Sequence, residues 1–403
     1  MSELYQQIRT LIASVIPARG GASGAVTHLL PSVGWGGNER LACTLHRLAQ
    51  EGGWRSRMDA PMHPRLHPGL WEDGGADSDE SQQFRSQSSA LSDTQALVAW
   101  ARAARRRAKI ERPAVVHAHL AWPDRAGLAL YASAGAPLVL TFGLLPAPNA
   151  HYSSDELLRW RSDNVLANVH ARLSRVWFVA PSEADAARLC ALVGPRASAR
   201  VRHIANCAPL PRVHRKNPQG FRWPEDTLRV LTVARLVPQK GLSRALEAMA
   251  HPSLRALRWH WLIAGEGELQ RALRAQVSAL GLADRVTFAG DLRADALYPD
   301  ADVLLSTSHT EGFALVPLEA IEAGCPVLLS PIVAHHELLG AHTPEALLPR
   351  DETQWPDALL SWFLSRQRLK ELALQQGSIL AQDPRAATRE AYDLLYREVA
   401  RCA

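Results

Sequence analysis

The sequence lacks a long apolar segment. Although 47% of the chain is hydrophobic, no stretch approaches the ~18 uninterrupted apolar residues that suggest a membrane-spanning helix. Near the N-terminus the apolar residues are spaced rather than contiguous, which is not the pattern of a secretory signal peptide. We therefore expect an ordinary globular protein without a transmembrane helix.

Cysteine and net charge are also low. The five cysteines, Cys43, Cys190, Cys207, Cys325 and Cys402, have neither metal-ligand spacing nor the density of a disulfide framework. A reducing, cytoplasmic compartment is the natural expectation. The net charge of +5 is too small to indicate nucleic acid as a partner, but it is compatible with anionic substrates or an anionic membrane surface.

The chain is long enough for two domains. Strand-like apolar runs alternate with helical segments in both halves, which predicts an α/β fold. Residues 208–227 are rich in proline and basic residues and are a plausible linker. We expect a first domain over residues 1–207 and a second over residues 208–385, followed by an amphipathic helix over residues 386–403.

Residues 301–330 contain a strand, a polar loop, a helix and a second strand, in that order. Pro317 suits the first turn of the helix, and Gly324 suits its C-terminal end. The two strands, 303–305 and 326–329, are therefore expected to be parallel with a right-handed crossover. The polar loop 307–312 between strand and helix has no evident reason to be buried.

The start of this helix is where chemistry is expected. Ligands of open α/β sheets bind at the carboxyl ends of strands, and a helix N-terminus there suits phosphate. Glu311 and Glu319 lie at the same place, and carboxylates accept hydrogen bonds from sugar hydroxyls. The combination indicates a sugar nucleotide, although solvated or helix-capping glutamates explain the spacing equally well.

Two further loops have groups suited to phosphate. Glycines precede a helix over residues 40–50, but neither the G-x-G-x-x-G pattern nor the P-loop lysine pattern is present. Arg235 and Lys240 follow the strand 227–234 and suit a diphosphate, unless they are ordinary surface cations. Gly265 and Gly267 follow the strand 259–264 and open the helix after it.

His119 ends the strand 115–119. His117 and His119 have a spacing possible for metal ligands, but no acidic or cysteine partner lies nearby in the sequence, so no metal is expected. The helix predicted over residues 95–112 is strongly basic, with one acid among its cations: Arg102, Arg105, Arg106, Arg107, Lys109 and Arg112. It suits either an anionic membrane surface or an ordinary solvated face.

A family resemblance rests on these motifs. The segment EGFALVPLEAIEAGCPVLLS, residues 311–330, resembles the donor-site signature of the retaining glycosyltransferases of family 4. The segment from Arg235 to Gly241 is similar to the family's R-L-x-x-x-K-G, and residues 36–40 to its Gly-Gly-x-Glu-Arg loop. The resemblance implies the GT-B fold: two Rossmann-like domains facing across a cleft, with the last helix crossing back onto the first domain.

The resemblance also implies roles for individual residues. Glu311 would contact the donor sugar, Glu319 the ribose hydroxyls, and Arg235 and Lys240 the leaving diphosphate, while His119 would face the cleft. The remaining donor-binding residues would be Gly312, Phe313, Ala314, Leu315, Val316, Gly265, Gly267, Gly36 and Gly37. No cofactor is implied, since the nucleotide diphosphate sugar is a substrate.

The sequence departs from the family at two places. Gly143 stands where a histidine of the sugar site is usual, and Val333 and Ala334 stand where two glycines are usual. The expected reaction is retaining transfer of a sugar to a hydroxyl of a glycan, a lipid-linked sugar or a small molecule, in glycan, polysaccharide or glycolipid biosynthesis. The alternatives are a nucleotide-sugar epimerase or phosphorylase of the same fold, or a catalytically degenerate partner subunit.

Overall fold

The structure, a computed structural model, describes residues 24–30, 37–60, 93–120, 126–143, 145, 175–209, 221–290, 292 and 296–402. Of the predicted site residues, Gly36 lies outside these ranges. The chain divides into two compact units. The first comprises Met1–Pro146, Ser154–Leu210 and Pro384–Ala403, and the second Ala147–Ser153 and Pro211–Asp383.

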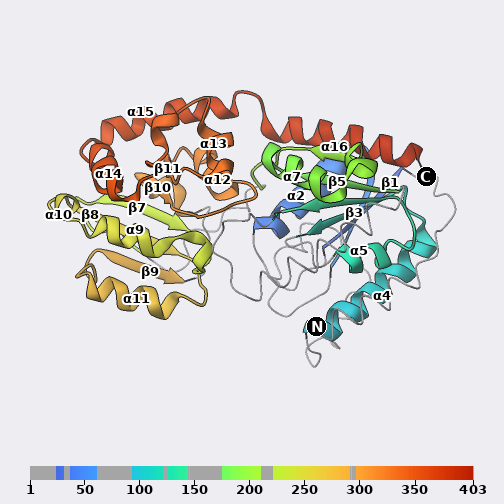
Figure 1. Cartoon of the computed structure of the whole chain (residues 1–403), viewed down its shortest axis with the longest axis horizontal. Helices are drawn as coiled ribbons and strands as arrows, with labels where there is room; N and C mark the ends of the chain where they lie inside the picture. The colour runs from blue at the N-terminus through green and yellow to red at the C-terminus, as the bar shows by residue number, and fades with distance from the viewer. Residues whose placement is uncertain are drawn as a thin grey trace. The chain divides into compact units, whose positions relative to one another are not determined.

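The described residues of the first unit form a six-stranded parallel sheet in the order β2-β1-β3-β4-β5-β6 (Figure 1). The strands are β1 (Ala25–Leu29), β2 (Arg55–Asp59), β3 (Val115–Leu120), β4 (Leu138–Phe142), β5 (Val176–Ala180) and β6 (Val201–His203). The helices are α2 (Gly37–Glu51), α4 (Asp93–Glu111), α5 (Ala126–Ala132), α7 (Glu183–Val193), α8 (Pro195–Ser198) and α16 (Pro384–Arg401).

Four strands of this sheet, β1, β3, β4 and β5, confirm the apolar runs read from the sequence. They are buried almost throughout, as expected for parallel strands covered on both faces. The edge strands β2 and β6 were not predicted. β2 reads RSRMD and is mostly part-exposed, and β6 has three residues, so neither carries a strong apolar signal.

The C-terminal helix α16 packs on the first unit. Tyr392, Leu395, Tyr396 and Val399 are buried in one cluster with residues of α2, β1, β3, β4 and β5. The helix is also held by polar contacts, because the indole of Trp54 donates to Asp393 at 2.8 Å.

The described residues of the second unit form a five-stranded parallel sheet in the order β11-β10-β7-β8-β9. The strands are β7 (Leu228–Val233), β8 (Trp259–Ala264), β9 (Val286–Gly290), β10 (Val303–Ser306) and β11 (Val327–Leu329). The helices are α9 (Leu242–Met249), α10 (Pro252–Arg255), α11 (Gln270–Ala279), α12 (Leu315–Glu322), α13 (Val333–Leu339), α14 (Trp355–Phe363) and α15 (Arg366–Gly377). Short 3₁₀ turns are η3 (Pro238–Lys240), η5 (Tyr298–Asp300), η6 (Pro344–Ala346), η7 (Glu352–Gln354) and η8 (Ser378–Leu380).

The strand order places a topological switch point between β7 and β10. The chain proceeds from β7 to β8 and β9 on one side, and β10 then pairs on the other side of β7. At such a switch point the loops after the two central strands run in opposite directions, and open α/β sheets bind ligands there. β10, α12 and β11 form the predicted βαβ unit, and its two strands are parallel as expected. The loops after β7 and β10 carry Lys240 and Glu311.

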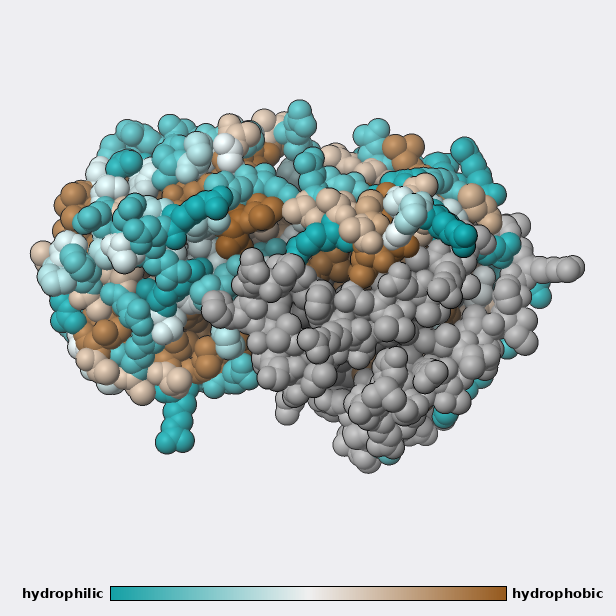
Figure 2. Space-filling model, viewed as in Figure 1, coloured by the Kyte–Doolittle hydropathy of each residue, from teal (hydrophilic) through white to brown (hydrophobic). Residues whose placement is uncertain are grey.

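The surface in view is largely polar. Figure 2 shows mostly hydrophilic residues with smaller apolar groups between them over the second unit. Within the described ranges, the exposed large apolar side chains are Ile110, Val333, Leu364, Leu374 and Leu394. Among the helices that the structure describes, none has the length and apolar character needed to cross a bilayer.

Gly241 lets the loops after β7 and β10 approach each other. Its φ is +61°, and an ideal Cβ there would lie 2.2 Å from the carbonyl oxygen of Thr307. We expect Gly241→Ala to lower the free energy of unfolding by ~2–5 kcal/mol, the sum of left-handed strain and overpacking. Urea unfolding measures this change.

Gly324→Ala is the matched control. Gly324 has a φ of +77° and nothing within 4 Å of an added Cβ, so only the strain of ~1–2 kcal/mol is expected. Equal losses in the two variants would show that the approach of the two loops contributes nothing to the requirement for glycine.

Candidate active site

Lys240 and Glu311 meet at the switch point of the second unit. Lys240 ends the 3₁₀ turn η3 after β7, and Glu311 lies in the loop after β10. The Lys240 Nζ lies 2.5 Å from the Glu311 Oε1, which also accepts from the Ser308 hydroxyl at 2.6 Å. Their side chains are only 18% and 16% exposed, so the structure brings together two residues predicted as catalytic.

The pair keeps Glu311 ionised. Burial alone raises the pKa of this carboxyl, but the charge of Lys240 and the hydrogen bonds from Lys240 and Ser308 outweigh burial. The pKa of Glu311 therefore lies below its ordinary value. A carboxylate at neutral pH can only accept hydrogen bonds, as recognition of a hydroxyl requires.

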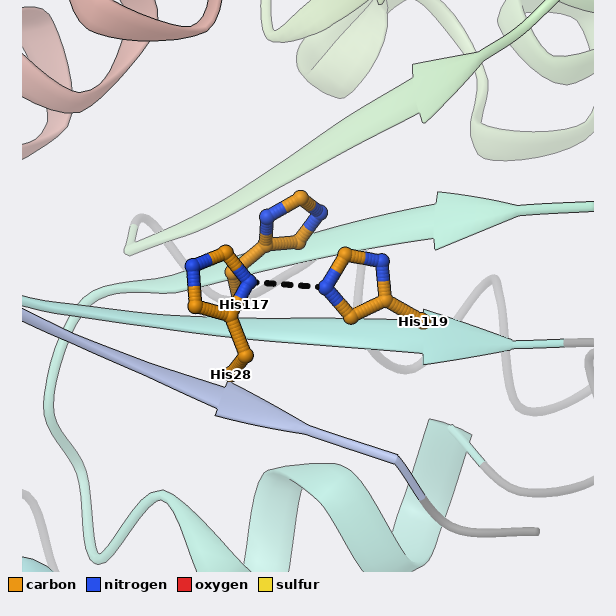
Figure 3. Close-up of side chains that lie close together, drawn as sticks. All are labelled: His28, His117 and His119. Carbon is orange, nitrogen blue, oxygen red and sulfur yellow. Dashed lines mark hydrogen bonds between the residues drawn. The ribbon is translucent and has the colours of Figure 1, made fainter. Parts of the chain in front are cut away.

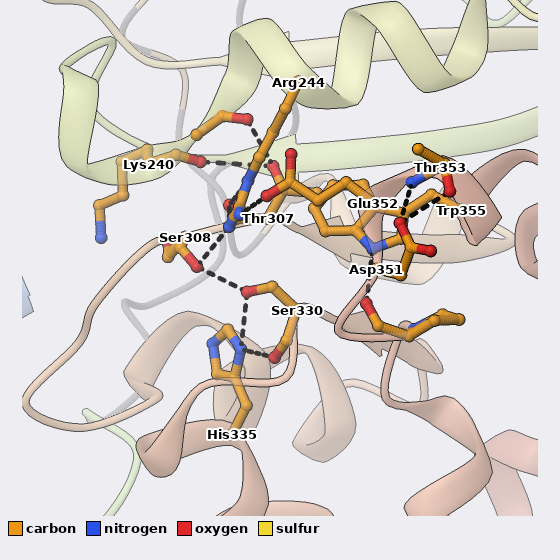
Figure 4. Close-up of polar contacts among 12 residues, drawn as sticks. Lys240, Arg244, Thr307, Ser308, Ser330, His335, Asp351, Glu352, Thr353 and Trp355 are labelled. Carbon is orange, nitrogen blue, oxygen red and sulfur yellow. Dashed lines mark hydrogen bonds and ion pairs between the residues drawn. The ribbon is translucent and has the colours of Figure 1, made fainter. Parts of the chain in front are cut away.

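The expectation of an exposed polar loop was wrong. Thr307, Ser308, Thr310 and Gly312 are buried. Their burial is possible because neighbouring side chains satisfy the loop carbonyls. Arg244 donates to the carbonyls of Thr307 and Ser308, at 2.6 and 2.9 Å from Nη2 (Figure 4).

Gln239 completes the support of this loop. The side-chain amide of Gln239 donates to the Thr310 carbonyl at 2.8 Å. The backbone carbonyl of Gln239 accepts from the His309 N–H, also at 2.8 Å. Arg244 in turn stacks on Trp355, with 4.8 Å from Cζ to the ring centroid, and forms an ion pair with Glu352. Sequence reasoning missed both residues, although each lies within four positions of the motif lysine, Lys240.

Glu319 has a different environment from Glu311. It lies in α12, is 8% exposed and accepts from the Tyr298 hydroxyl at 3.0 Å. Tyr298 is itself buried in the turn η5. One predicted glutamate is thus bonded to a cation and the other to a neutral phenol.

The start of α12 provides backbone donors beside these glutamates. The N-cap residue is Ala314, whose side chain cannot accept a hydrogen bond, and N–H groups at the first turn of a helix have no partner within the helix. The predicted donor-binding residues Gly312, Phe313, Ala314, Leu315 and Val316 all lie at this start. The position suits an anion, because the N-terminal end of a helix dipole is positive.

The other predicted residues of the second unit lie in the adjoining loops. Added Cβ atoms at Gly265 and Gly267 would lie 1.9 Å from the carbonyl oxygen of Ala234 and 2.4 Å from that of Leu236. Packing against the loop after β7 therefore accounts for both glycines, whatever they bind. Arg235 is exposed in that loop, and its guanidinium has no hydrogen bond or ion pair with the residues that the structure describes.

The two family glycines are replaced at the start of a helix. Val333 is the first residue of α13 and is 57% exposed, whereas Ala334 is buried. Both replacements therefore lie in the first turn of α13. The next residue, His335, is completely buried, and sequence reasoning gave it no role.

The predicted residues His119 and Gly37 belong to the first unit. Gly37 begins α2, and His119 is the next-to-last residue of β3. The side chain of His119 is almost fully buried, and its Nε2 lies 2.9 Å from the Nδ1 of His28 on β1 (Figure 3). Burial and the charge of His46 lower the pKa of His119 to about 3, so the ring is neutral at physiological pH.

The three histidines His28, His117 and His119 lie close enough for a metal, with one nitrogen of each within 4.8 Å of the others. Their geometry favours hydrogen bonding instead. The Nδ1 of His117 is 2.6 Å from the Tyr396 hydroxyl and its Nε2 is 2.7 Å from the Thr141 hydroxyl. The ring centroids of His117 and His119 lie 4.0 Å apart, so the two rings pack against each other. Ligands of one metal ion would instead point their lone pairs at a common position.

Gly143 leaves room for a neighbouring side chain. An ideal Cβ at this position would lie 2.8 Å from the Oδ1 of Asn38. Asn38 lies in the first turn of α2, and its buried Nδ2 has no partner among the described residues. An asparagine thus borders the position where the family has a histidine. His151, a possible substitute for that ring, lies outside the described residues.

Comparison with known proteins covers both units. The model of the Glycosyltransferase Family 4 matches residues 35–211, and the model of the Glycosyl transferases group 1 matches residues 213–374. The putative colanic acid biosynthesis glycosyltransferase WcaL of Salmonella typhimurium is 29% identical over 176 residues, 41% of this chain and 43% of its own. For the first curated relatives the match spans only 32–43% of their length.

Solved structures resemble nearly the whole chain. HepE of Anabaena, solved with UDP-glucose, has a TM-score of 0.68 at 18% identity and covers 92% of this chain and 99% of its own. A sucrose-phosphate synthase of Thermosynechococcus elongatus has a TM-score of 0.70 at 19% identity, covering 94% and 100%. Together the two family models match most of the chain and show that it belongs to the family 4 glycosyltransferases. The likeness to the solved structures shows the GT-B type of α/β fold.

Proposed function

We propose that the protein is a retaining glycosyltransferase that moves a sugar from a nucleotide diphosphate donor to an acceptor hydroxyl. The observation that carries the proposal is the Lys240–Glu311 pair at the switch point, 2.5 Å apart and beside the start of α12. A cation and a helix N-terminus suit the diphosphate, and a carboxylate suits the sugar hydroxyls.

Relatives indicate the classes of donor and acceptor. HepE is described with UDP-glucose and with UDP and glucose. WcaL is named for colanic acid biosynthesis and RfbU of Salmonella typhimurium as an O-antigen chain mannosyltransferase. By analogy, we assign this chain a nucleotide sugar donor and a glycan or lipid-linked acceptor of polysaccharide biosynthesis.

The proposed chemistry is electrostatic. Negative charge grows on the diphosphate as the glycosidic bond breaks, and Lys240, Arg235 and the first N–H groups of α12 stabilise it without a metal. Glu311 holds the transferred sugar, and the leaving phosphate helps to deprotonate the acceptor on the same face, which retains the anomeric configuration. The diphosphate competes with Glu311 for Lys240, so donor binding rearranges this ion pair.

The first test is product release with a panel of nucleotide sugars. We expect free nucleoside diphosphate to appear with at least one donor in the presence of acceptor, and Lys240→Ala to lower kcat by ~100–1000-fold. Lys370→Ala is the control, since Lys370 is an exposed lysine of α15 in the same unit. Wild-type turnover in folded Lys240→Ala protein would remove the diphosphate role.

Other outcomes identify the alternative functions. A phosphorylase would require orthophosphate or release a sugar phosphate. An epimerase working without hydrolysis would convert the donor without an acceptor, and a degenerate subunit would turn over none of the donors. Any of these results would contradict the proposed transfer reaction.

The two glutamates should have separable roles. Glu319 is proposed to bind ribose hydroxyls, which do not change in the reaction, so Glu319→Gln should weaken nucleoside diphosphate binding and raise the donor KM. Glu311→Gln should lower kcat and leave nucleoside diphosphate affinity within about twofold. Calorimetric titration of both variants measures the difference. Equal weakening of binding in both variants would contradict the division of roles.

Fewer cations of the basic helix α4 are available to a membrane surface than its sequence suggested. Arg105 is buried, donates to the Tyr131 carbonyl at 2.8 Å and stacks on that ring. Arg107 forms a bidentate ion pair with Asp59. Both arginines therefore serve the fold of the first unit and are not available to a lipid surface.

The remaining exposed cations on one face of α4 are Arg102, Arg106 and Lys109. We propose that they contact an anionic membrane, with the neighbouring Ile110, which is 80% exposed. Vesicle sedimentation should show binding to anionic vesicles that weakens with salt, and the triple alanine variant should lose it. The same binding to neutral vesicles, or in the triple variant, would leave these residues as a solvated face. None of the five cysteines, all of which the structure describes, forms a disulfide, in agreement with the proposed reducing compartment.

A further inference from the structure

His335 has one ring nitrogen fixed and the other without a partner. The Nδ1 lies 2.8 Å from the carbonyl oxygen of Ser330. A carbonyl can only accept, so the Nδ1 carries the proton and the Nε2 of the neutral ring carries the lone pair. The Nε2 is buried and has no hydrogen-bond partner among the described residues. Buried polar atoms nearly always have a hydrogen-bond partner, so an atom without one is unusual and points to a bound ligand or water.

This nitrogen belongs to the environment of the Lys240–Glu311 pair. The charges of both residues act on the ring, since the Glu311 carboxylate raises the pKa of His335 and the Lys240 ammonium lowers it. The Ser330 hydroxyl donates to the Ser308 carbonyl at 2.7 Å, and Ser308 donates to Glu311. Figure 4 shows the His335 ring against Ser330, with its other nitrogen turned away from that residue.

The ring remains neutral across the physiological range. Burial lowers the pKa of His335 to about 4, with the Glu311 carboxylate and the bond to the Ser330 carbonyl only partly opposing it. A neutral ring in this tautomer offers an acceptor next to a carboxylate. Phosphate oxygens have no proton to give it at neutral pH, whereas hydroxyl groups do.

We propose that the His335 Nε2 accepts a hydrogen bond from a hydroxyl of the transferred sugar and so helps to select the donor. The inference rests on the proposed function and adds a specificity residue to it. The ring has no exposed surface, so a hydroxyl reaches it only after a neighbouring side chain moves. Lys240 is the neighbour with a reason to move, because the diphosphate competes with Glu311 for its ammonium.

Two isosteric variants separate this role from a structural one. His335→Asn keeps an amide N–H near the Nδ1 position, so it can still donate to Ser330, but it has no atom at the Nε2 position. His335→Gln places an amide oxygen near the Nε2 position but loses the donor to Ser330. A residue that serves only the fold should therefore tolerate asparagine better than glutamine, and a sugar-binding residue should show the reverse in activity.

The measurements are the Tm, nucleoside diphosphate affinity, and kcat/KM with the accepted donor and its single-deoxy analogues. We expect His335→Asn to keep its Tm and diphosphate affinity while kcat/KM falls about tenfold or more. His335→Gln should lose less kcat/KM than His335→Asn. One deoxy donor should give equal kcat/KM in wild type and His335→Asn, because it lacks the hydroxyl that the ring accepts.

Several outcomes would overturn the proposal. Wild-type kcat/KM in folded His335→Asn protein would mean that no sugar hydroxyl donates to the His335 Nε2, which then bonds to an internal water or has no partner. A loss that is the same for every deoxy donor would mean a general packing effect. If His335→Asn does not fold, a His335→Gln protein that folds but fails to turn over the donor would be equally negative. Each of these leaves glycosyl transfer by the wild type intact, whereas absence of transfer in the wild type removes the proposed function as well.

Discussion

The site of the second unit depends on one ion pair, Lys240 with Glu311. The strand order places β7 and β10 side by side. The loops after these two strands carry the pair, and they also bond to each other through the His309 N–H and the Gln239 backbone carbonyl. Parallel strands alone would bring the loops near each other, but not to hydrogen-bonding distance. Gly241 removes the side chain that would collide with Thr307, and the 3₁₀ turn before it directs Lys240 toward Glu311. A backbone feature thus sets the geometry of a charged contact.

Burial of the loop after β10 has an electrostatic consequence for this pair. The loop turns several carbonyls toward the interior, and each needs a donor. Arg244 and Gln239 supply these donors, so the Lys240 ammonium is not used to satisfy the backbone. Lys240 is bonded to the Glu311 carboxylate instead. The donors that hold the loop and the cation of the ion pair are therefore different side chains, as the proposed exchange of Glu311 for a diphosphate requires.

The sequence allowed the fold to be predicted further than the site. The buried parallel strands could be predicted because they are continuous apolar runs covered on both faces. The strand predicted over residues 259–264, for example, has the bounds of β8. The edge strand β2 was not predicted, because its sequence RSRMD has little apolar pattern. In the site, Glu311 and Lys240 were found through local motifs. Arg244 was missed because its partners, the carbonyls of Thr307 and Ser308, lie 63 and 64 positions away in the sequence. A local sequence pattern does not predict hydrogen bonds over such separations.

The two units also differ in the kind of polar group that they bury. In the second unit, Lys240, Arg244 and Glu311 keep charges at the ends of the strands. In the first unit, β1 and β3 bring His28, His117 and His119 together, and burial lowers the pKa of each ring. A neutral imidazole has one donor and one acceptor nitrogen and carries no charge to offset that of an anion. That contrast favours the second unit for the charged part of the proposed nucleotide sugar. It favours the first unit for an uncharged hydroxyl group. The Asn38 amide beside Gly143 is a further donor there, since its Nδ2 has no partner among the described residues.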